Sequence, residues 1–240
     1  MMIKKLEELR IKIFTDGAER ASMLELAKNP LIKGLTTNPT LMQKAGITDY
    51  AGFAKEILAE IKDKPISFEV FSDDFTEMER QARLIASWAP NIYVKIPITN
   101  TKKEPSYDLI KKLSNDGIKL NVTAIFSISQ VKDTRDVLRT DVPAIISVFA
   151  GRLADTGVDP IPVMKEAKAI LAGNPNFELL WASPRELLNI YHAEEAGSDI
   201  ITVTPDVLKK AANIGLDPEE FSLQTVKMFY DDGQKAGYIL

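Results

Sequence analysis

Two patterns of apolar residues alternate along the chain. Short runs of apolar and β-branched residues predict strands, and stretches in which apolar residues recur every three or four positions predict amphipathic helices. The predicted strands cover residues 11–15, 34–37, 66–71, 92–98, 118–126, 144–149, 177–182 and 199–203. The predicted helices cover residues 50–62, 76–88, 106–115, 129–138, 162–172, 184–196 and 205–212.

Eight such units in 240 residues correspond to about 30 residues each, which is what a compact (β/α)8 barrel needs. The nearly continuous apolar run 144–149 is typical of a parallel strand covered by helices. No linker or change in composition divides the chain. We therefore predict an α/β fold, a single TIM-barrel domain over residues 1–240 with a C-terminal helical tail, 217–240. Within the tail, 221–230 reads as an amphipathic helix that packs on the barrel or on a neighbouring subunit.

Composition narrows the range of partners. The net charge of -4 argues against binding to nucleic acid or to an anionic membrane surface. The longest apolar stretch, 142–151, is shorter than the roughly 18 residues of a membrane span, and residues 1–10 lack the apolar core of a signal peptide. We expect a soluble, cytoplasmic protein that acts on small molecules.

The chain has no cysteine and one histidine, His192. It therefore has no disulfide, thiolate nucleophile or cysteine-ligated metal. A single histidine rules out a multi-histidine zinc site and disfavours a metal-dependent aldol mechanism. We expect His192, in a helical stretch, to have an ordinary surface or packing role, and the protein to need no metal or cofactor.

One lysine interrupts the apolar strand 92–98. Alternation places Tyr93, Lys95 and Pro97 on one face of that strand, and lysine is rarely buried without a reason. Desolvation disfavours the ammonium form, so Lys95 is a candidate nucleophile that attacks a carbonyl and forms a Schiff base. The alternative is a structural lysine that reaches water or pairs with a carboxylate such as Glu69. The strand alone leaves both open.

Polar residues recur at the C-terminal ends of the predicted strands, where (β/α)8 barrels have their active sites. Each has a structural alternative: Asp16 and Asn38 suit turns or helix caps, and Arg152 and Arg185 suit the surface. Their recurrence at the same end of seven strands favours one shared site. The candidate residues are Asp16, Thr36, Asn38, Glu69, Lys95, Asn121, Thr123, Ser147, Phe149, Arg152, Ser183 and Arg185.

These motifs resemble those of the transaldolases, specifically the short subfamily that also contains the fructose-6-phosphate aldolases. The resemblance runs from about residue 13 to residue 208. It rests on GLTTNPTL at 34–41, VKIP at 94–97, NVTAIFS at 121–127, FAGR at 149–152 and ASPR at 182–185.

The resemblance implies that Lys95 forms the Schiff base and that Asp16 handles the proton of the hydroxyl next to the breaking carbon–carbon bond. It also implies that Glu69 and Thr123 hold a water that moves protons while the carbinolamine becomes an imine. The remaining implied roles concern substrate binding. Those residues are Thr36, Asn38, Asn121 and Ser147 for the hydroxyls of the dihydroxyacetone unit, Phe149 beside it, and Arg152, Ser183 and Arg185 for the terminal phosphate.

The same resemblance implies transfer of a dihydroxyacetone unit between sugar phosphates, as in the pentose phosphate pathway. The aldolases of the subfamily typically have glutamine and tyrosine where this chain has Glu69 and Phe149, which favours transfer over cleavage. Gly17, Val148 and Pro184 depart from the family pattern. Since the last two lie near the anion site, a sulfonated ketose is an alternative to a phosphate.

Two other possibilities are open: retro-aldol cleavage of fructose 6-phosphate, and a catalytically silent protein that binds sugar phosphates. The resemblance further implies a homo-oligomer, a pentamer or a decamer, with the C-terminal helix at an interface.

Overall fold

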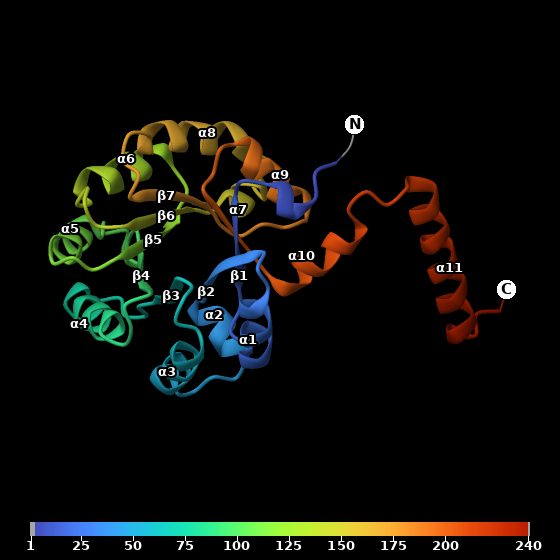
Figure 1. Cartoon of the computed structure of the whole chain (residues 1–240), viewed down its shortest axis with the longest axis horizontal. Helices are drawn as coiled ribbons and strands as arrows, with labels where there is room; N and C mark the ends of the chain where they lie inside the picture. The colour runs from blue at the N-terminus through green and yellow to red at the C-terminus, as the bar shows by residue number, and fades with distance from the viewer. Residues whose placement is uncertain (1–2, 240) are drawn as a thin grey trace.

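The computed structural model describes residues 3–239. At its centre is a closed barrel of eight parallel strands in chain order (Figure 1). The strands are β1 (Lys12–Asp16), β2 (Ile32–Thr36), β3 (Ile66–Glu69), β4 (Ile92–Pro97), β5 (Leu120–Ile125), β6 (Ala144–Val148), β7 (Phe177–Trp181) and β8 (Ile200–Val203). This confirms the predicted (β/α)8 barrel. Each predicted strand overlaps an observed one.

Helices surround the barrel, and several differ from the prediction. They are α1 (Arg20–Lys28), α2 (Pro39–Lys44), α3 (Tyr50–Glu60), α4 (Phe75–Ala86), α5 (Tyr107–Asn115), α6 (Ile128–Val137), α7 (Ala150–Ala154), α8 (Pro160–Leu171), α9 (Leu188–Glu195), α10 (Pro205–Lys209) and α11 (Pro218–Ala236). Short 3-10 turns occupy Leu6–Glu8 and Lys210–Asn213. The prediction omitted α1, α2 and α7, and it started α9 too early.

The late start of α9 has a local cause. Ser183 has a left-handed backbone with φ 60°. After it, the Asn189 side chain accepts hydrogen bonds from the backbone N–H groups of Arg185 and Glu186, at 2.8 and 3.2 Å. These bonds hold a turn where the apolar periodicity predicts a helix.

Two apolar regions support the strands. The larger lies between the barrel and its helices, and Val94 and Ile96 of β4 are fully buried in it. The smaller fills part of the barrel interior with Phe14, Ile145, Leu180, Ala182 and Ile200. Gly34 is required beside this interior cluster, because a Cβ there would lie 2.5 Å from the Phe14 ring. The barrel is therefore packed inside, and its open volume lies at one end.

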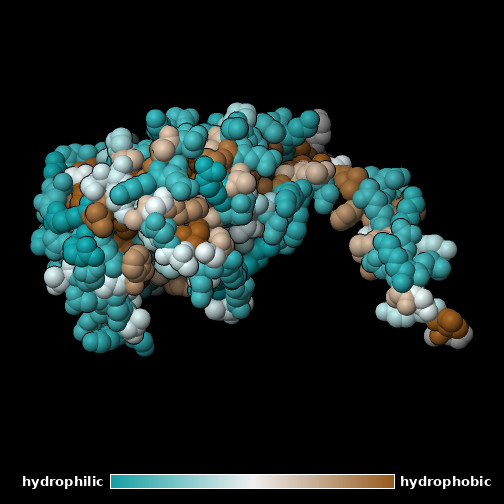
Figure 2. All heavy atoms as spheres, turned by 90° about the horizontal axis from the view of Figure 1, so that it is seen from below, coloured by the Kyte–Doolittle hydropathy of each residue, from teal (hydrophilic) through white to brown (hydrophobic). Residues whose placement is uncertain are grey.

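The C-terminal helix α11 stands away from the barrel (Figure 1). Asp217 caps its first turn through Glu219 and Glu220, and Gly237 ends it with φ 67°. Apolar side chains are exposed along this arm (Figure 2), and no described residue of α11 is buried. They are Phe221, Leu223, Val226, Met228, Phe229 and Tyr230.

The predicted tail helix is thus present and longer than expected. The alternative that this helix packs on the barrel of its own chain is wrong, because α11 lies away from the barrel and none of its described residues is buried. Packing against another subunit stays a prediction, and Leu240 lies outside the described residues. Within residues 3–239, no helix is both long enough and apolar enough to span a membrane.

Candidate active site

A cavity of about 490 Å³ opens at the C-terminal ends of the strands, the end at which barrels of this type bind ligands. This cavity is lined by all of the candidate residues that the sequence analysis singled out. A second cavity of about 350 Å³ adjoins it, and Asp16, Leu41, Lys44 and Thr204 line both. The structure therefore brings the predicted residues together in one place.

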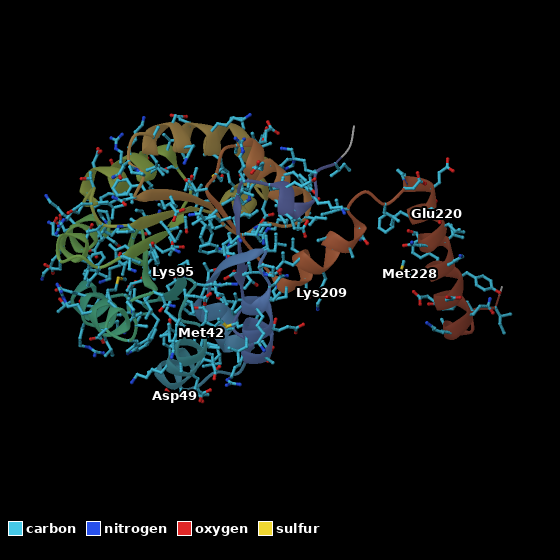
Figure 3. All side chains as sticks on the ribbon, viewed as in Figure 1. Met42, Asp49, Lys95, Lys209, Glu220 and Met228 are labelled. Carbon is cyan, nitrogen blue, oxygen red and sulfur yellow. The ribbon has the colours of Figure 1, made fainter. Side chains whose placement is uncertain are left out.

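Lys95 lies on β4 inside the barrel (Figure 3) and is 7% exposed. Its Nζ lies 3.0 Å from Oε2 of Glu69, and it donates a hydrogen bond of 2.8 Å to the backbone carbonyl of Thr37. The strand register places Glu69 directly opposite Lys95. The carboxylate partner considered as an alternative is therefore present, in direct contact. At this distance, a proton on the lysine can pass to the carboxylate without an intervening group.

The backbone of Glu69 is held by Tyr50 from α3. The Tyr50 hydroxyl donates to the Glu69 carbonyl at 2.8 Å and accepts from the Glu69 N–H at 2.9 Å. Burial is the main cause that raises the pKa of Tyr50, so its hydroxyl stays protonated. This pair of bonds fixes the end of β3, from which the Glu69 side chain extends to Lys95.

Asp16 ends β1 and reaches the cavity from beside Lys95. The Thr36 hydroxyl donates to its Oδ1 at 2.8 Å. Desolvation is the largest cause that raises the pKa of Asp16. The charge of Lys95 and the Thr36 hydrogen bond oppose this effect, and Glu69 adds to it. Asp16 therefore takes up a proton at a higher pH than an ordinary aspartate does, which suits a group that accepts and returns protons.

A second set of hydrogen bonds joins β6, β5 and β3. Ser147 donates to Oδ1 of Asn121 at 2.6 Å, and the Asn121 amide donates to the Ser67 hydroxyl at 3.0 Å. These three residues are nearly or fully buried. Thr123 lies above them on β5, and its Oγ1 is buried with no partner among the described residues. A buried hydroxyl of this kind is a place where a water or a substrate oxygen gains a hydrogen bond.

Asn38 has the capping role that was considered as its alternative. Its Oδ1 accepts from the backbone N–H of Leu41 at 2.9 Å, at the start of α2. The side chain nevertheless lines the cavity. Because the oxygen is used in the cap, the amide NH₂ group is the part of Asn38 that is suited to donate to a ligand.

Two arginines and Ser183 form the cationic end of the cavity. Arg152 on α7 has its guanidinium carbon 5.4 Å from the centre of the Phe149 ring. Arg185 is exposed, and its Nε donates to Asp155 at 3.2 Å. Gly151 allows this packing, because a Cβ there would lie 1.6 Å from the Ser183 carbonyl oxygen. The cavity thus has a carboxylate and lysine centre and a guanidinium end, at which Asp155 binds Arg185 through both Nε and Nη2. A guanidinium is suited to planar, bidentate binding of an anion.

The prediction missed several residues of this region: Lys44, Tyr50, Ser67, Thr202 and Thr204. Lys44, Thr202 and Thr204 line the cavity, and Tyr50 and Ser67 contact residues that do. Thr202 had a usable signal, because alternation along the predicted strand 199–203 places it two residues from Ile200, which faces the interior.

Comparison with known proteins agrees with this architecture. Residues 13–237 match the family described as Transaldolase/Fructose-6-phosphate aldolase. A "Probable transaldolase" of Dehalococcoides mccartyi is 36% identical over 200 residues, covering 82% of this chain and 88% of that protein. One of Lactiplantibacillus plantarum is 38% identical over 202 residues, covering 83% and 88%. One of Sphingopyxis alaskensis is 33% identical over 229 residues, covering 95% and 99%.

Among solved structures, 2,3-dimethylmalate lyase aligns with a TM-score of 0.55 at 14% identity, covering 97% of this chain and 86% of that one. A structure titled "Native KDPGal structure" aligns with a TM-score of 0.54 at 11% identity, covering 86% of each chain. At this identity the likeness concerns the fold alone.

The fold and the cavity define a (β/α)8 barrel with a buried lysine and two carboxylates at its C-terminal end. The match over residues 13–237 and the relatives at 33–38% identity then identify the family of this barrel protein. The chain belongs to the Transaldolase/Fructose-6-phosphate aldolase family, and its relatives support an enzyme.

Proposed function

We propose that this protein is a class I transaldolase, which transfers a dihydroxyacetone unit from a ketose phosphate to an aldose phosphate through a Schiff base on Lys95. Fructose 6-phosphate and sedoheptulose 7-phosphate are the donors we propose. The observation that carries the proposal is the position of the Lys95 amine, which lines the cavity and lies 3.0 Å from Glu69 Oε2. Family membership supports it.

In the proposed reaction, Glu69 accepts a proton from Lys95, and the free amine attacks the ketose carbonyl carbon. The resulting carbinolamine loses water, with Glu69 returning the proton and Thr123 holding the water. The protonated imine that remains is an electron sink. Asp16 then takes the proton of the C4 hydroxyl, the C3–C4 bond breaks, and its electron pair forms a neutral enamine on Lys95. An aldose phosphate leaves, and transfer to a second aldose reverses these steps.

The two ends of the cavity suit different parts of the proposed substrate. We assign the hydroxyls of the dihydroxyacetone unit to Thr36, Asn38, Asn121 and Ser147. The Oδ1 atoms of Asn121 and Asn38 already accept hydrogen bonds, from Ser147 and from the Leu41 N–H, which supports a donor role for their amide groups. We assign the distal anion to Arg152, Ser183 and Arg185. A phosphate suits the guanidinium pair, and a sulfonate is the alternative.

The fate of the enamine separates transfer from cleavage. Phe149 lines the cavity and contributes no hydroxyl that would deliver a proton to the enamine carbon. Without that proton the enamine persists until an aldose adds to it, which favours transfer over release of free dihydroxyacetone. Retro-aldol cleavage is the second candidate function, because the family includes enzymes of both kinds.

We also propose a homo-oligomer, a pentamer or a decamer, in the cytoplasm, with sugar phosphates as partners and no nucleic acid or membrane. The exposed apolar side chains of α11 support association, because a helix that buries none of its described side chains gains little stability from its own sequence. Cross-linking or sedimentation of the full chain measures the number of subunits. A monomer at working concentration would contradict this part.

Borohydride trapping tests the Schiff base. Reduction in the presence of fructose 6-phosphate is expected to attach the dihydroxyacetone or ketose mass to the peptide that contains Lys95. Lys95→Ala is expected to lose both the adduct and the activity. The control is Lys111→Ala, an exposed lysine on α5, which is expected to keep both. An active Lys95→Ala variant would defeat the proposal.

A second assay separates the candidate functions. Fructose 6-phosphate is supplied first alone and then with an aldose phosphate such as erythrose 4-phosphate. Turnover only with the aldose supports transfer. Free dihydroxyacetone that accumulates without an aldose supports cleavage, and tight binding with no trapped imine supports a silent binding protein. A sulfonated ketose, run in parallel, tests the distal anion.

A further inference from the structure

Three side chains that line the cavity, from three adjacent strands of the barrel, form a chain of hydrogen bonds. The Thr36 hydroxyl donates to Oδ1 of Asp16 at 2.8 Å, and the hydroxyls of Thr36 and Thr202 are 2.5 Å apart. Asp16 ends β1, and the two threonines lie on the strands that flank it, β2 and β8. Thr36 and Thr202 are 2% and 6% exposed. The strands on both sides of β1 therefore each contribute one hydroxyl to the chain of hydrogen bonds that ends at the Asp16 carboxylate.

The chemistry of a hydroxyl gives this chain of hydrogen bonds a direction. A threonine hydroxyl carries a single hydrogen, and Thr36 uses it on the Asp16 carboxylate. When Asp16 is ionised and accepts from Thr36, the hydrogen of the short bond between the two threonines comes from Thr202. The order of donation is Thr202 to Thr36 to Asp16.

We propose that Thr202 is a positioning residue for the reaction: by donating to Thr36 it keeps Thr36 turned as a donor to Oδ1 of Asp16, so that Oδ2 is the oxygen that exchanges a proton with the substrate. The proposal rests on the proposed function, in which Asp16 takes the proton of the C4 hydroxyl. A threonine that lost its partner would be free to turn its hydroxyl toward other acceptors, and Asp16 would lose a fixed donor.

Two effects are expected from this arrangement. A hydroxyl that accepts a hydrogen bond is a stronger donor, so Thr202 strengthens the bond from Thr36 that lowers the pKa of Asp16. It also restricts the rotation of the carboxylate. Removing the Thr202 hydroxyl should therefore raise the pKa of Asp16 further and slow the step in which carbon–carbon bond cleavage needs an ionised carboxylate.

The charged side chains around Asp16 come from several elements of the barrel. From inside the barrel it faces Lys95 on β4 and Glu69 on β3. Lys44 on α2 lines both cavities, and Glu19 and Asp206 line the smaller one. The described ends of β2 and β8 beside Asp16 present the two threonines and no charge. Because Thr202 is uncharged, its replacement leaves this set of charges unchanged.

The test compares the wild type with Thr202→Val, Thr202→Ser and a matched control, Thr15→Val. Thr15 precedes Asp16 on β1 and is also a buried threonine, but its Oγ1 has no hydrogen-bond partner among the described residues. Thr202→Val is expected to lower kcat on the order of tenfold, with a smaller change in KM, and to move the acid limb of the kcat/KM profile to higher pH. Thr202→Ser is expected to restore both, and Thr15→Val to leave both unchanged.

Two further readouts separate this inference from the proposed function. Borohydride trapping shows whether the imine on Lys95 still forms. Carbon-13 NMR of aspartate-labelled protein, with the Asp16 signal assigned from Asp16→Asn, follows the titration of Asp16 without any turnover. A normal imine yield together with a higher titration midpoint in Thr202→Val supports the positioning role. An unmoved midpoint and pH profile, or equal effects in Thr15→Val, would overturn it. Loss of trapping in the wild type would overturn the proposed function and leave the NMR comparison valid.

Discussion

The contact between Lys95 and Glu69 predicts how the stability of the protein responds when either charge is removed. Lys95→Met and Glu69→Gln each delete one charge with little change in volume. The double variant deletes both. We expect each single change to lower the free energy of unfolding and the double change to lower it less than the two together, because a partner left alone in the barrel has no countercharge.

The magnitude follows from the distance and the burial. At 3.0 Å and an effective dielectric constant of about 20, the attraction is roughly 5 kcal/mol. Moving the two ions out of water costs several kcal/mol each, so the pair contributes little net stability. Losing one partner of a buried pair costs about 3–5 kcal/mol. The Glu69 side chain is 17% exposed at the cavity, so we expect a cost at or just below the lower limit of that range, about 2–3 kcal/mol for each single variant.

Urea unfolding measures these values, with tryptophan fluorescence, to which the fully buried Trp181 contributes, as the probe and the protein concentration held constant. The double variant is expected to lie within about 1 kcal/mol of the wild type, which gives a coupling energy of about 3–6 kcal/mol. Single variants that each match the wild type to within about 0.5 kcal/mol, with additive effects in the double variant, would refute the idea of a desolvated charged pair.

Three further predictions concern the rest of the site. The folded-state pKa of Asp16 lies above its unfolded value, so the folded protein binds the additional proton and stability falls as the pH rises from the lower pKa to the higher. Asp16→Asn should therefore raise the urea midpoint at pH 7 and abolish transfer, and a lower midpoint would contradict the sign. Phe149→Tyr adds a hydroxyl at the cavity and should increase acceptor-free release of dihydroxyacetone by roughly tenfold, measured enzymatically; unchanged release would count against the role given to Phe149. Gly151→Ala brings a Cβ against the Ser183 carbonyl and should raise KM for phosphorylated ketoses on the order of tenfold in steady-state kinetics, with kcat less affected; an unchanged KM would show that this packing does not position the anion site.

The barrel could be predicted because its strands follow a simple rule. Parallel strands covered by helices are continuously apolar, and 144–149 shows this directly. The three omitted helices lack such a rule. Of the nine residues of α1, only Met23 is buried, so the helix contributes little to the core. α2 and α7 have six and five residues, too few for a period of 3.6 to be recognised.

The position of the site was predictable to the level of strand ends and no further. The rule that polar residues at those ends meet in one place singled out Lys95 and Asp16, and both line the cavity. It does not specify which side chains bond to each other. A threonine such as Thr202 is a common strand residue whether or not its hydroxyl has a partner, and its contact with Thr36 depends on the stagger of neighbouring strands in the closed barrel. The position of α11 away from the barrel was not predictable for the same reason, because local periodicity does not specify the path of the chain after α10.

The apolar part of the barrel interior explains why the polar residues next to it depend on hydrogen bonds and ion pairs with one another. Phe14, Leu180 and Ile200 exclude water from below, so a carboxylate placed over them, as Asp16 is, loses hydration on that side. Burial is the largest cause that raises its pKa, and the charge of Lys95 and the Thr36 hydrogen bond offset only part of it. A sugar that fills the cavity would remove water from the other side as well and raise the cost of the Asp16 charge further. In the proposed reaction, the proton of the C4 hydroxyl is then transferred to a base whose negative charge is costly to keep, so the apolar barrel interior favours this step.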